Sequence, residues 1–394
     1  MDLPLQGYKV IEIAQIYAGP YCGLQLAHFG AEVIKIEAPG TGEFLRQRPP
    51  AKHGANYGFL MLNAGKKSVS LNLKDPRGRE ILFRLLADAD VMLENYAPGA
   101  LEALGLGYDD LAARFPRLVY ASSKGYGPDS RFAQLGSMDF TIQAASGIIS
   151  MTGYEDRPGV RVTAALIDTS TGMHLAAGIL AALLERGRTG RGRKVEVAML
   201  DVCIPAINGA IGVVQDGYKV RRLGNRHASA CPCNTYPCAD GEIWIYCLTE
   251  NHWQEFARVM HREDLLARPE YRDHHSRYKI VDEVDALVGR WSAAHKRDEL
   301  ISLLVAHHIP CAPVRDIAEV CNDPELPARH IVRDGTIADH DDIKVLGSAI
   351  KMSGLRGDEI APHVPELGEH TSEVLGRLGL SADEIASLRR DGVL

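Results

Sequence analysis

Short runs rich in β-branched residues alternate with helical segments through the first 200 residues, and this alternation constrains the fold more than any other feature. Helices are predicted at 21–29, after Pro20, and at 76–87, with Asp75 as the N-cap. The β-branched runs predict strands at 8–13, 32–37, 68–72, 91–95 and 118–122. Strands and helices that alternate in this way form parallel βαβ units, so we predict an α/β fold with a doubly wound sheet.

The second half of the chain changes character. A strongly apolar helix is predicted at 170–185, ended by a basic and glycine-rich stretch. From about Val214 to residue 240 the chain is polar and rich in Gly, Pro and Cys, which predicts a connector. A strand at 242–247 and helices at 253–260 and 296–307 follow. The predicted segments are therefore a large domain over 1–210, a smaller α+β domain over 225–320, and a tail over 330–394 that packs back onto the large domain.

Composition narrows the class of protein. The 394 residues are 46% hydrophobic and 24% charged, which is typical of a globular chain and excludes intrinsic disorder. A net charge of −7 argues against nucleic-acid and polybasic membrane binding. Eight cysteines are too few for a disulfide scaffold, and the first residues lack the pattern of a signal peptide. The apolar stretch Leu175–Leu184 is shorter than the ~20 residues of a membrane span, so we expect a cytoplasmic protein.

Familiar cofactor motifs are incomplete. Gly40-Thr41-Gly42 fails the GxGxxG pattern because Leu45 occupies the place of the third glycine, and Gly65–Ser68 lacks the spacing of a phosphate-binding P-loop. A nicotinamide-dependent dehydrogenase is therefore unsupported. Ala121–Gly125 matches the hydrolase elbow GxSxG except at its first position, which leaves a hydrolase as a weak alternative.

Possible metal ligands are sparse. Cys231, Cys233 and Cys238, with His227 as a fourth ligand, could bind zinc, but ordinary loop thiols are the favoured interpretation. The acidic and histidine-containing runs at 307–308 and 339–342 are interpreted as solvated surface. We therefore expect no metal site.

Asp168 directly precedes the long apolar helix predicted at 170–185. Asp is among the best N-caps, and a helix N-terminus favours its negative charge, so the residue pattern alone favours a capping role. The alternative is a nucleophilic carboxylate held at the start of a helix among apolar neighbours.

A series of short motifs, each weak alone, spans nearly the whole chain in a fixed order. The motifs are Val10–Ile13, Ala18–Pro20, Gly30–Glu37, Asn63–Ser68, Leu71–Lys74, Glu94–Gly99, Lys124–Gly127, Asp139 with Gln143–Gly147, the Asp168 segment, Gly190–Gly192, His308–Pro310 and Leu367–Thr371. In this order they resemble the family III CoA-transferases, the CaiB/BaiF-like family. The resemblance favours the nucleophilic interpretation of Asp168.

The resemblance implies a fold and an activity. The expected fold is a Rossmann-like large domain built from both chain ends, with a smaller domain between them, and two chains threaded as interlocked rings in a homodimer. The expected activity is transfer of CoA from an acyl-CoA donor to a carboxylic acid acceptor, through an aspartyl anhydride and an aspartyl-CoA thioester on Asp168. CoA and acyl-CoA are then substrates, and no permanently bound cofactor is expected.

The resemblance also implies which residues contact CoA. Ile16, Tyr17 and Ala18 match the loop along the pantetheine arm. The nucleotide side matches Leu71, Asn72, Leu73, Lys74, Asn95, Tyr96 and Ala97, and Lys124 and Asp139 complete the predicted CoA-binding residues. Ala38 and Gly136 replace basic residues of some relatives.

The same resemblance is compatible with two other functions. An α-methylacyl-CoA racemase uses a His–Asp pair for proton transfer, but Met138 stands before Asp139 here, and a thioether cannot transfer a proton. A non-catalytic CoA-binding protein is disfavoured by the presence of Asp168. Leu248–Trp253 lacks the glycines that family members acting on formate and oxalate carry, so other acids are expected. Arg46 and Arg48 suggest a small dicarboxylate.

Overall fold

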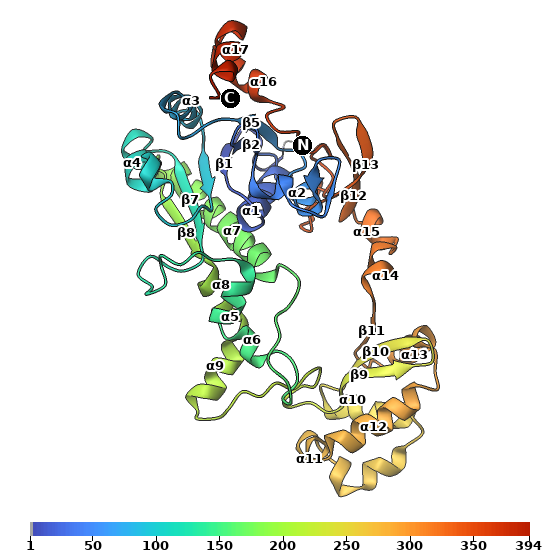
Figure 1. The fold of residues 1–394 in the computed structure, drawn as a ribbon. Coiled ribbons are helices and arrows are strands. Elements are labelled where there is room, and N and C mark those ends of the chain that lie inside the picture. The colour runs from blue at the N-terminus through green and yellow to red at the C-terminus, as the bar shows by residue number, and fades with distance from the viewer. Residues whose placement is uncertain (1–2) are drawn as a thin grey trace. The chain divides into compact units, whose positions relative to one another are not determined.

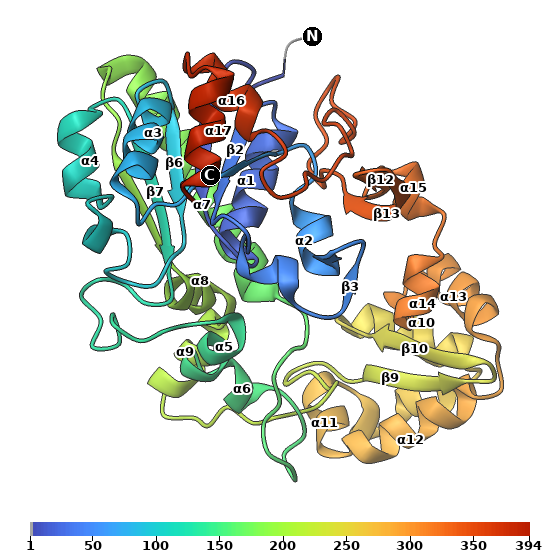
Figure 2. The same cartoon turned by 45° about the horizontal axis from the view of Figure 1, so that its top comes forward.

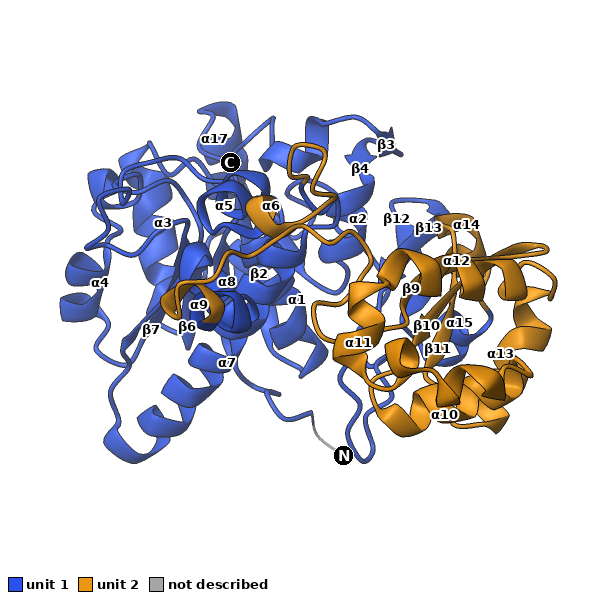
Figure 3. Ribbon diagram, turned by 90° about the horizontal axis from the view of Figure 1, so that it is seen from below, with its two compact units in different colours: residues 1–148, 161–212, 324–394 blue, residues 149–160, 213–323 orange. Residues whose placement is uncertain are grey.

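The computed structural model describes residues 3–394, and its internal contacts divide the chain into two units (Figure 3). Unit 1 contains the residues up to Ile148, Arg161–Gly212 and Pro324–Leu394, and unit 2 contains Ile149–Val160 and Val213–Asp323. Residues 149–160, which the sequence prediction places in the segment 1–210, thus lie in unit 2.

Six parallel strands form the central sheet of unit 1 in the order β5–β2–β1–β6–β7–β8 (Figure 1). They are β1 (Lys9–Ile13), β2 (Glu32–Glu37), β5 (Lys67–Ser70), β6 (Val91–Glu94), β7 (Val119–Lys124) and β8 (Lys194–Ala198). The predicted α/β fold with a parallel sheet is confirmed. The chain runs outward from β1 to β5 and then returns to β6, so the strand order reverses between β1 and β6. The loops that leave the carboxyl ends of these two strands diverge, and such a reversal is the usual place for a binding crevice.

Helices cover both faces of the sheet (Figure 2). Val10 and Val33 pack against α1 (Ala18–His28) and α7 (Leu166–Thr189). The alternate residues Ile11 and Ile34 belong to the core on the opposite face, which is formed by α3 (Pro76–Leu86), α4 (Tyr108–Arg114), α16 (Thr371–Arg377) and α17 (Ala382–Arg390). The C-terminal tail therefore completes the large unit, because α16 and α17 contribute Val374 and Ile385 to that core.

Smaller elements complete unit 1. One apolar cluster joins β4 (Ala55–Asn56), the hairpin of β12 (Val332–Ile337) and β13 (His340–Leu346), and the short helix α2 (Tyr57–Leu62). β3 (Ala51–Lys52) pairs with β4 to form a second hairpin. A second cluster joins α5 (Asp139–Ala145), the start of α7 and α8 (Met199–Ala206). The remaining elements are η1 (Phe44–Gln47), η2 (Glu102–Leu104) and α15 (Glu325–Ala328), with α6 (Ile148–Met151) and α9 (Asn208–Gln215) at the boundaries with unit 2.

Unit 2 is an antiparallel sheet covered by helices around a core that contains Trp253 and Phe256. Its strands lie in the order β11–β10–β9, with bounds β9 (Cys233–Cys238), β10 (Gly241–Tyr246) and β11 (Cys311–Val314). Its helices are α10 (Glu250–Val259), η3 (Glu263–Ala267), η4 (Pro269–Tyr271), α11 (His274–Lys279), α12 (Val281–Ser292), α13 (Arg297–Ala306) and α14 (Ile317–Cys321).

The predicted connector at about 214–240 is partly wrong, because Cys233–Cys238 is a strand paired with β10. Within residues 3–394 all eight cysteines are free, and Cys231, Cys233 and Cys238 do not form a group that could hold a metal ion. The zinc alternative therefore lacks the convergence of ligands that it requires.

The ends of α3 and α7 can be compared with the ends that the sequence predicted. The Asp75 carboxylate accepts a hydrogen bond from the Arg77 N–H at 2.8 Å, so the predicted cap of α3 is confirmed. α7 begins at Leu166 rather than at 170 and ends at Thr189, and the left-handed backbone of its C-cap residue Gly190 (φ +73°) closes the helix. By length and hydropathy α7 meets the criteria for a membrane span, but Leu175 and Ile179 lie in the hydrophobic core, as they do in the core helix of a globular unit.

Candidate active site

A cavity of about 280 Å³ lies in unit 1 at the carboxyl ends of β1, β6 and β7, where the strand order reverses. Four segments line it: the loop Gln15–Ala18 after β1, the stretch Asn95–Pro98 after β6, the end of β7, and the residues that lead into α5. Asp168 and Met199 complete the lining. Of the predicted site residues, the fold thus brings Ile16, Tyr17, Ala18, Asn95, Tyr96, Ala97, Lys124 and Asp168 together at this cavity.

Asp168 lies in the first turn of α7, as the third residue of the helix, and not at its N-cap. The capping interpretation of Asp168 is therefore wrong. The N-cap residue, Ala165, has no side chain that could cap, so the helix takes its cap from elsewhere in the chain.

Asp139 supplies that cap from the first turn of α5. Its Oδ2 accepts hydrogen bonds from the backbone N–H groups of Ile167 (2.9 Å) and Asp168 (3.1 Å). Gln143 donates from Nε2 to Asp139 Oδ1 at 2.6 Å. Asp139 is 5% exposed and does not line the cavity, so in this structure it positions the start of α7 and with it Asp168, whereas the sequence placed it among the CoA contacts.

The carboxyl group of Asp168 is mostly shielded from water. Burial, with a further contribution from the negative charge of Asp139, raises the pKa of Asp168 to about 7. A raised pKa makes the ionised carboxylate more basic, and the N-terminus of α7 favours its negative charge. At neutral pH the substrate-free protein therefore holds a mixture of ionised and neutral Asp168.

The loop after β1 has a strained conformation. Ile16 has φ +70°, which is rare for a β-branched residue and marks backbone held by its surroundings. Asn95 holds it: Asn95 Oδ1 accepts from the Gln15 N–H and Asn95 Nδ2 donates to the Gln15 carbonyl, both at 2.8 Å. The predicted contact residue Asn95 thus uses its amide to shape the loop that lines the cavity.

A buried ion-pair network of Glu12, Lys35 and Lys66 holds the backbone of the loop after β1. Lys35 Nζ lies 2.9 Å from Glu12 Oε1 and donates to the Ala14 carbonyl at 2.7 Å. Lys66 Nζ lies 2.8 Å from Glu12 Oε2 and donates to the Pro20 carbonyl at 2.8 Å. The two ammonium groups therefore fix the backbone on either side of Ile16, Tyr17 and Ala18. Burial lowers the pKa of Lys66 to about 8, although Glu12 acts in the opposite direction.

Sequence reasoning missed this network, although its members stand out. Glu12 and Lys35 are charged residues inside runs of Val and Ile that form central strands, and a charge buried in a parallel sheet needs a partner. A glycine on α1 makes room for it: a Cβ at Gly23 would lie 1.9 Å from Glu12 Oε2.

The two arginines predicted to bind an acidic substrate are engaged elsewhere. Arg46 makes a bidentate pair with Glu37 at 2.7 and 2.8 Å and lies over the Phe59 ring. Arg48 lies over the ring of Phe44. Neither lines the cavity, so the argument for a dicarboxylate substrate from these residues is not supported.

A second cavity, of about 610 Å³, contains the other predicted contact segment, Leu71–Lys74. Tyr96 lines both cavities and is the residue that they share. Lys124 Nζ lies 2.8 Å from Glu94 Oε2 and donates to the Tyr96 carbonyl at 2.7 Å, so it holds the chain at Tyr96. The Lys74 side chain, by contrast, is exposed.

The structure bears on the hydrolase and racemase alternatives that the sequence left open. The Ser122 and Ser123 side chains are buried within β7, which continues to Lys124, so the sharp strand-to-helix turn of a hydrolase elbow does not form there. Met138 lines the cavity beside the start of α5, at the place where a racemase needs its histidine.

The sequence and the fold of the chain are both similar to those of known proteins. The family model described as CoA-transferase family III matches residues 5–371. The formyl-CoA:oxalate CoA-transferases of Escherichia coli O157:H7 and Shigella dysenteriae serotype 1 are each 33% identical over 416 residues, covering 99% of both chains. A CAIB/BAIF family protein from Brucella suis is similar in structure, with a TM-score of 0.85 and 30% identity over 96% of this chain and 100% of that one. A hypothetical protein from Mycobacterium tuberculosis gives a TM-score of 0.82 and 30% identity over 94% and 99% of the two chains.

Proposed function

The chain belongs to CoA-transferase family III, and we propose that it transfers CoA between two carboxylic acids with Asp168 as the nucleophile. One observation supports the assignment above all others. As described for residues 3–394, Asp168 is the one carboxylate in the lining of the cavity at the strand reversal, and that lining contains no histidine or cysteine. A carboxylate attacks without an adjacent base once it is ionised, which fits a site with no base beside it.

The proposed reaction conserves the energy of the thioester. An oxygen of Asp168 attacks the carbonyl carbon of the donor acyl-CoA, and the CoA thiolate leaves, which forms a mixed anhydride. The thiolate then attacks the Asp168 carbonyl carbon and releases the donor acid as its carboxylate, leaving an aspartyl-CoA thioester. The acceptor carboxylate attacks the carbonyl carbon of this thioester and expels the thiolate, which forms a second mixed anhydride between Asp168 and the acceptor acid. Attack of the thiolate on the acceptor acyl carbon gives the new acyl-CoA and restores the Asp168 carboxylate.

We place CoA along the two cavities described above, with one end of the molecule in each. The thiol end lies in the cavity with Asp168 along Ile16–Ala18, and the nucleotide end lies in the cavity with Leu71–Lys74, with Tyr96 between them. The exposed Lys74 ammonium is placed to meet a phosphate group as a point charge. Asn95 and Lys124 act indirectly, because the first fixes Gln15 and the second fixes the backbone at Tyr96.

The acids themselves are proposed to differ from formate and oxalate. In unit 2 the stretch Leu248–Trp253 forms the capped start of α10: Thr249 Oγ1 accepts from the His252 N–H at 3.2 Å. This stretch has no glycine and runs directly into a helix. A screen of purified protein with formyl-CoA and oxalate, beside other acyl-CoA donors and carboxylate acceptors, tests this directly. Turnover of the formyl-CoA and oxalate pair above all others would overturn the proposal.

Racemisation is the alternative that the fold shares. It needs a base at the position of Met138, and the Met138 thioether cannot accept a proton. We expect no α-deuterium exchange from a chiral 2-methylacyl-CoA in D₂O at a rate near that of CoA transfer. Exchange as fast as transfer would favour a racemase.

We also propose that two chains form an interlocked homodimer, as the family resemblance implies. The isolated chain exposes large apolar side chains on both units, among them Leu184 (75% exposed) and Tyr218 (71% exposed), which a second chain would cover.

Trapping tests the role of Asp168. The protein is incubated with an acyl-CoA donor and hydroxylamine, and the peptide that contains Asp168 is analysed by mass spectrometry. We expect conversion of Asp168 to a hydroxamate, and loss of transfer in Asp168→Asn with the fold retained. Asp383→Asn is the matched control, because Asp383 also lies in the first turn of a helix, α17, but is exposed. Substantial transfer by Asp168→Asn, or label on Asp139, would overturn the mechanism.

A further inference from the structure

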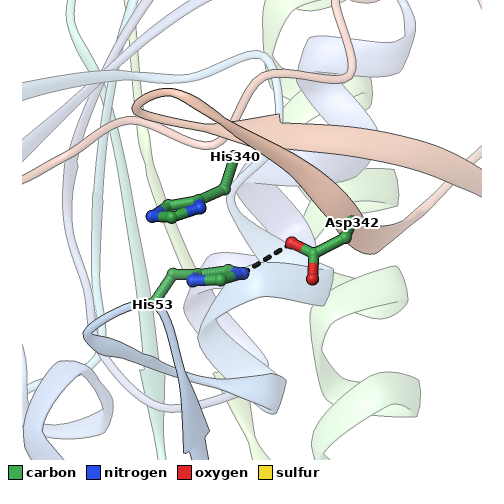
Figure 4. Close-up of side chains that lie close together, drawn as sticks. All are labelled: His53, His340 and Asp342. Atoms are coloured by element: carbon green, nitrogen blue, oxygen red, sulfur yellow. Dashed lines mark hydrogen bonds and ion pairs between the residues drawn. The ribbon is translucent and has the colours of Figure 1, made fainter.

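Two β-hairpins of unit 1 bring three possible metal ligands together, away from both cavities (Figure 4). His53 lies in the turn between β3 and β4, with a left-handed backbone (φ +49°). His340 and Asp342 lie at the start of β13, directly after the turn from β12. The sequence alone suggested only solvated surface at 339–342, because nothing in it brings His53 close.

The three side chains converge closely. His53 Nε2 lies 2.5 Å from Asp342 Oδ1, and the imidazole rings of His53 and His340 stack with centroids 3.6 Å apart and planes 8° from parallel. One ligand atom from each residue lies within 4.8 Å of the other two. In the described part of the chain, no other group of three such residues meets this distance.

The positions of the hairpins are fixed by packing beneath the cluster. Ala55 at β4 belongs to the same buried apolar cluster as Ile337 and Ile343, which flank the other hairpin turn. The backbone that carries the three side chains is therefore anchored, and only side-chain rotation is needed to adjust the ligands.

Lys52 is the charged neighbour that any cation would face. Its Nζ lies 2.8 Å from Asp342 Oδ2 and donates to the Asp342 carbonyl at 2.6 Å. Asp342 Oδ1 faces His53 and not Lys52, so it is the oxygen available to an ion. The Lys52 ammonium opposes a cation there by charge repulsion.

We propose that His53, His340 and Asp342 bind one Zn²⁺ ion, or a similar borderline divalent ion, with water as the fourth ligand. Two imidazoles and a carboxylate suit such ions, and an open fourth position is common outside closed structural sites. The ligands of one tetrahedral Zn²⁺ lie about 3.3 Å apart, so His53 and Asp342 separate by about 1 Å as the ion replaces the proton between them. The His340 ring also turns out of its parallel stack on His53, because each imidazole binds a metal through a lone pair in its own ring plane. The ion would link segments that are 289 residues apart in the sequence, and it would therefore bind the folded chain far better than the unfolded one.

Metal titration of the full-length protein tests this site without any activity assay. Protein freed of metal with a chelator is titrated with Zn²⁺ by calorimetry and with Co²⁺ by visible absorption, and its melting temperature is measured with and without Zn²⁺. We expect one ion per chain, the absorption bands of four-coordinate Co²⁺, and a melting temperature that rises with Zn²⁺. His340→Ala and Asp342→Asn should weaken binding at least tenfold, and Lys52→Met should tighten it because the repelling charge is removed.

The matched control is His275→Ala, which removes an exposed histidine of unit 2 and should leave Zn²⁺ affinity unchanged. His53→Gln provides a second ligand variant with a side chain of similar size, in case His340→Ala alters the hairpin. Equal affinity in the wild type and both histidine variants would place the ion on other groups, such as the exposed Cys321 thiol, and would overturn the proposal. No binding at 100-fold excess of Zn²⁺ over protein, or weaker binding in Lys52→Met, would also overturn it.

Discussion

Replacing Asp139 by asparagine isolates the electrostatic effect of one carboxylate on another. The variant removes a negative charge next to Asp168 but keeps an oxygen that can accept from the backbone N–H groups of Ile167 and Asp168. Because Asp139 raises the pKa of Asp168, that pKa falls in Asp139→Asn. The start of α7 should stay folded.

The size of the shift follows from the two causes. The pKa of Asp168 rises from an ordinary 3.8 to about 7, and burial contributes more than Asp139 does. Loss of Asp139's charge therefore removes the smaller part of that rise, and the pKa of Asp168 stays above 3.8 because the group remains buried. The two cap hydrogen bonds become neutral, and the bond from Gln143 Nε2 to Asp139 Oδ1 is lost because the amide nitrogen of Asn is a donor. Together these changes cost about 1–3 kcal/mol of folding free energy, which urea unfolding measures.

The assay is the pH dependence of kcat/KM for the acyl-CoA donor, which reports the free enzyme. Only ionised Asp168 attacks, so in the wild type kcat/KM rises with pH and levels off above about 7. In Asp139→Asn the same rise should occur at lower pH, while Asp383→Asn should match the wild type. A midpoint that stays in place or moves to higher pH in Asp139→Asn would refute the coupling of the two carboxylates.

Three further outcomes test the rest of the site and the assembly. Lys74→Ala should raise the Kd for CoA at least tenfold, because a charge-assisted phosphate contact contributes about 1.5–3 kcal/mol; unchanged affinity by calorimetry would move the nucleotide site elsewhere. Lys66→Met should destabilise the fold by about 3–5 kcal/mol in urea unfolding, because Glu12 is left buried with one partner fewer, and adding Glu12→Gln should recover part of that loss. An additive double variant would argue against the network. Interlocked chains cannot separate without unfolding, so the dimer should persist at nanomolar concentration in mass photometry; a folded monomer would contradict the proposed assembly.

The order of the strands and helices was readable from the sequence, because it depends on neighbours in the chain. β-Branched runs predicted the strands β1, β2, β6 and β7 to within two residues at each end, and Asp75 marked the start of α3. These signals are local: side-chain branching limits the backbone, and a cap bonds to an N–H two residues away. The family motifs added two predictions, that Asp168 is the nucleophile and that the matched segments lie along CoA.

Tertiary structure decided the electrostatics of the site. Asp139 lies 29 residues before Asp168, and no local pattern shows that it caps α7 or that it raises the pKa of Asp168. The sequence predicted that this helix starts at residue 170, four residues too late, because the cap that Asp139 provides is not visible in the local sequence. That cap places Asp168 inside the first turn.

The buried charges depend on the fold in the same way. Glu12 lies in β1, Lys35 in β2 and Lys66 directly before β5, and the three side chains meet only when the sheet forms. Local sequence sets the backbone conformations that a segment prefers. The pKa of a carboxyl group and the partner of a buried charge depend instead on groups that folding brings within a few ångströms, and on the water that folding removes.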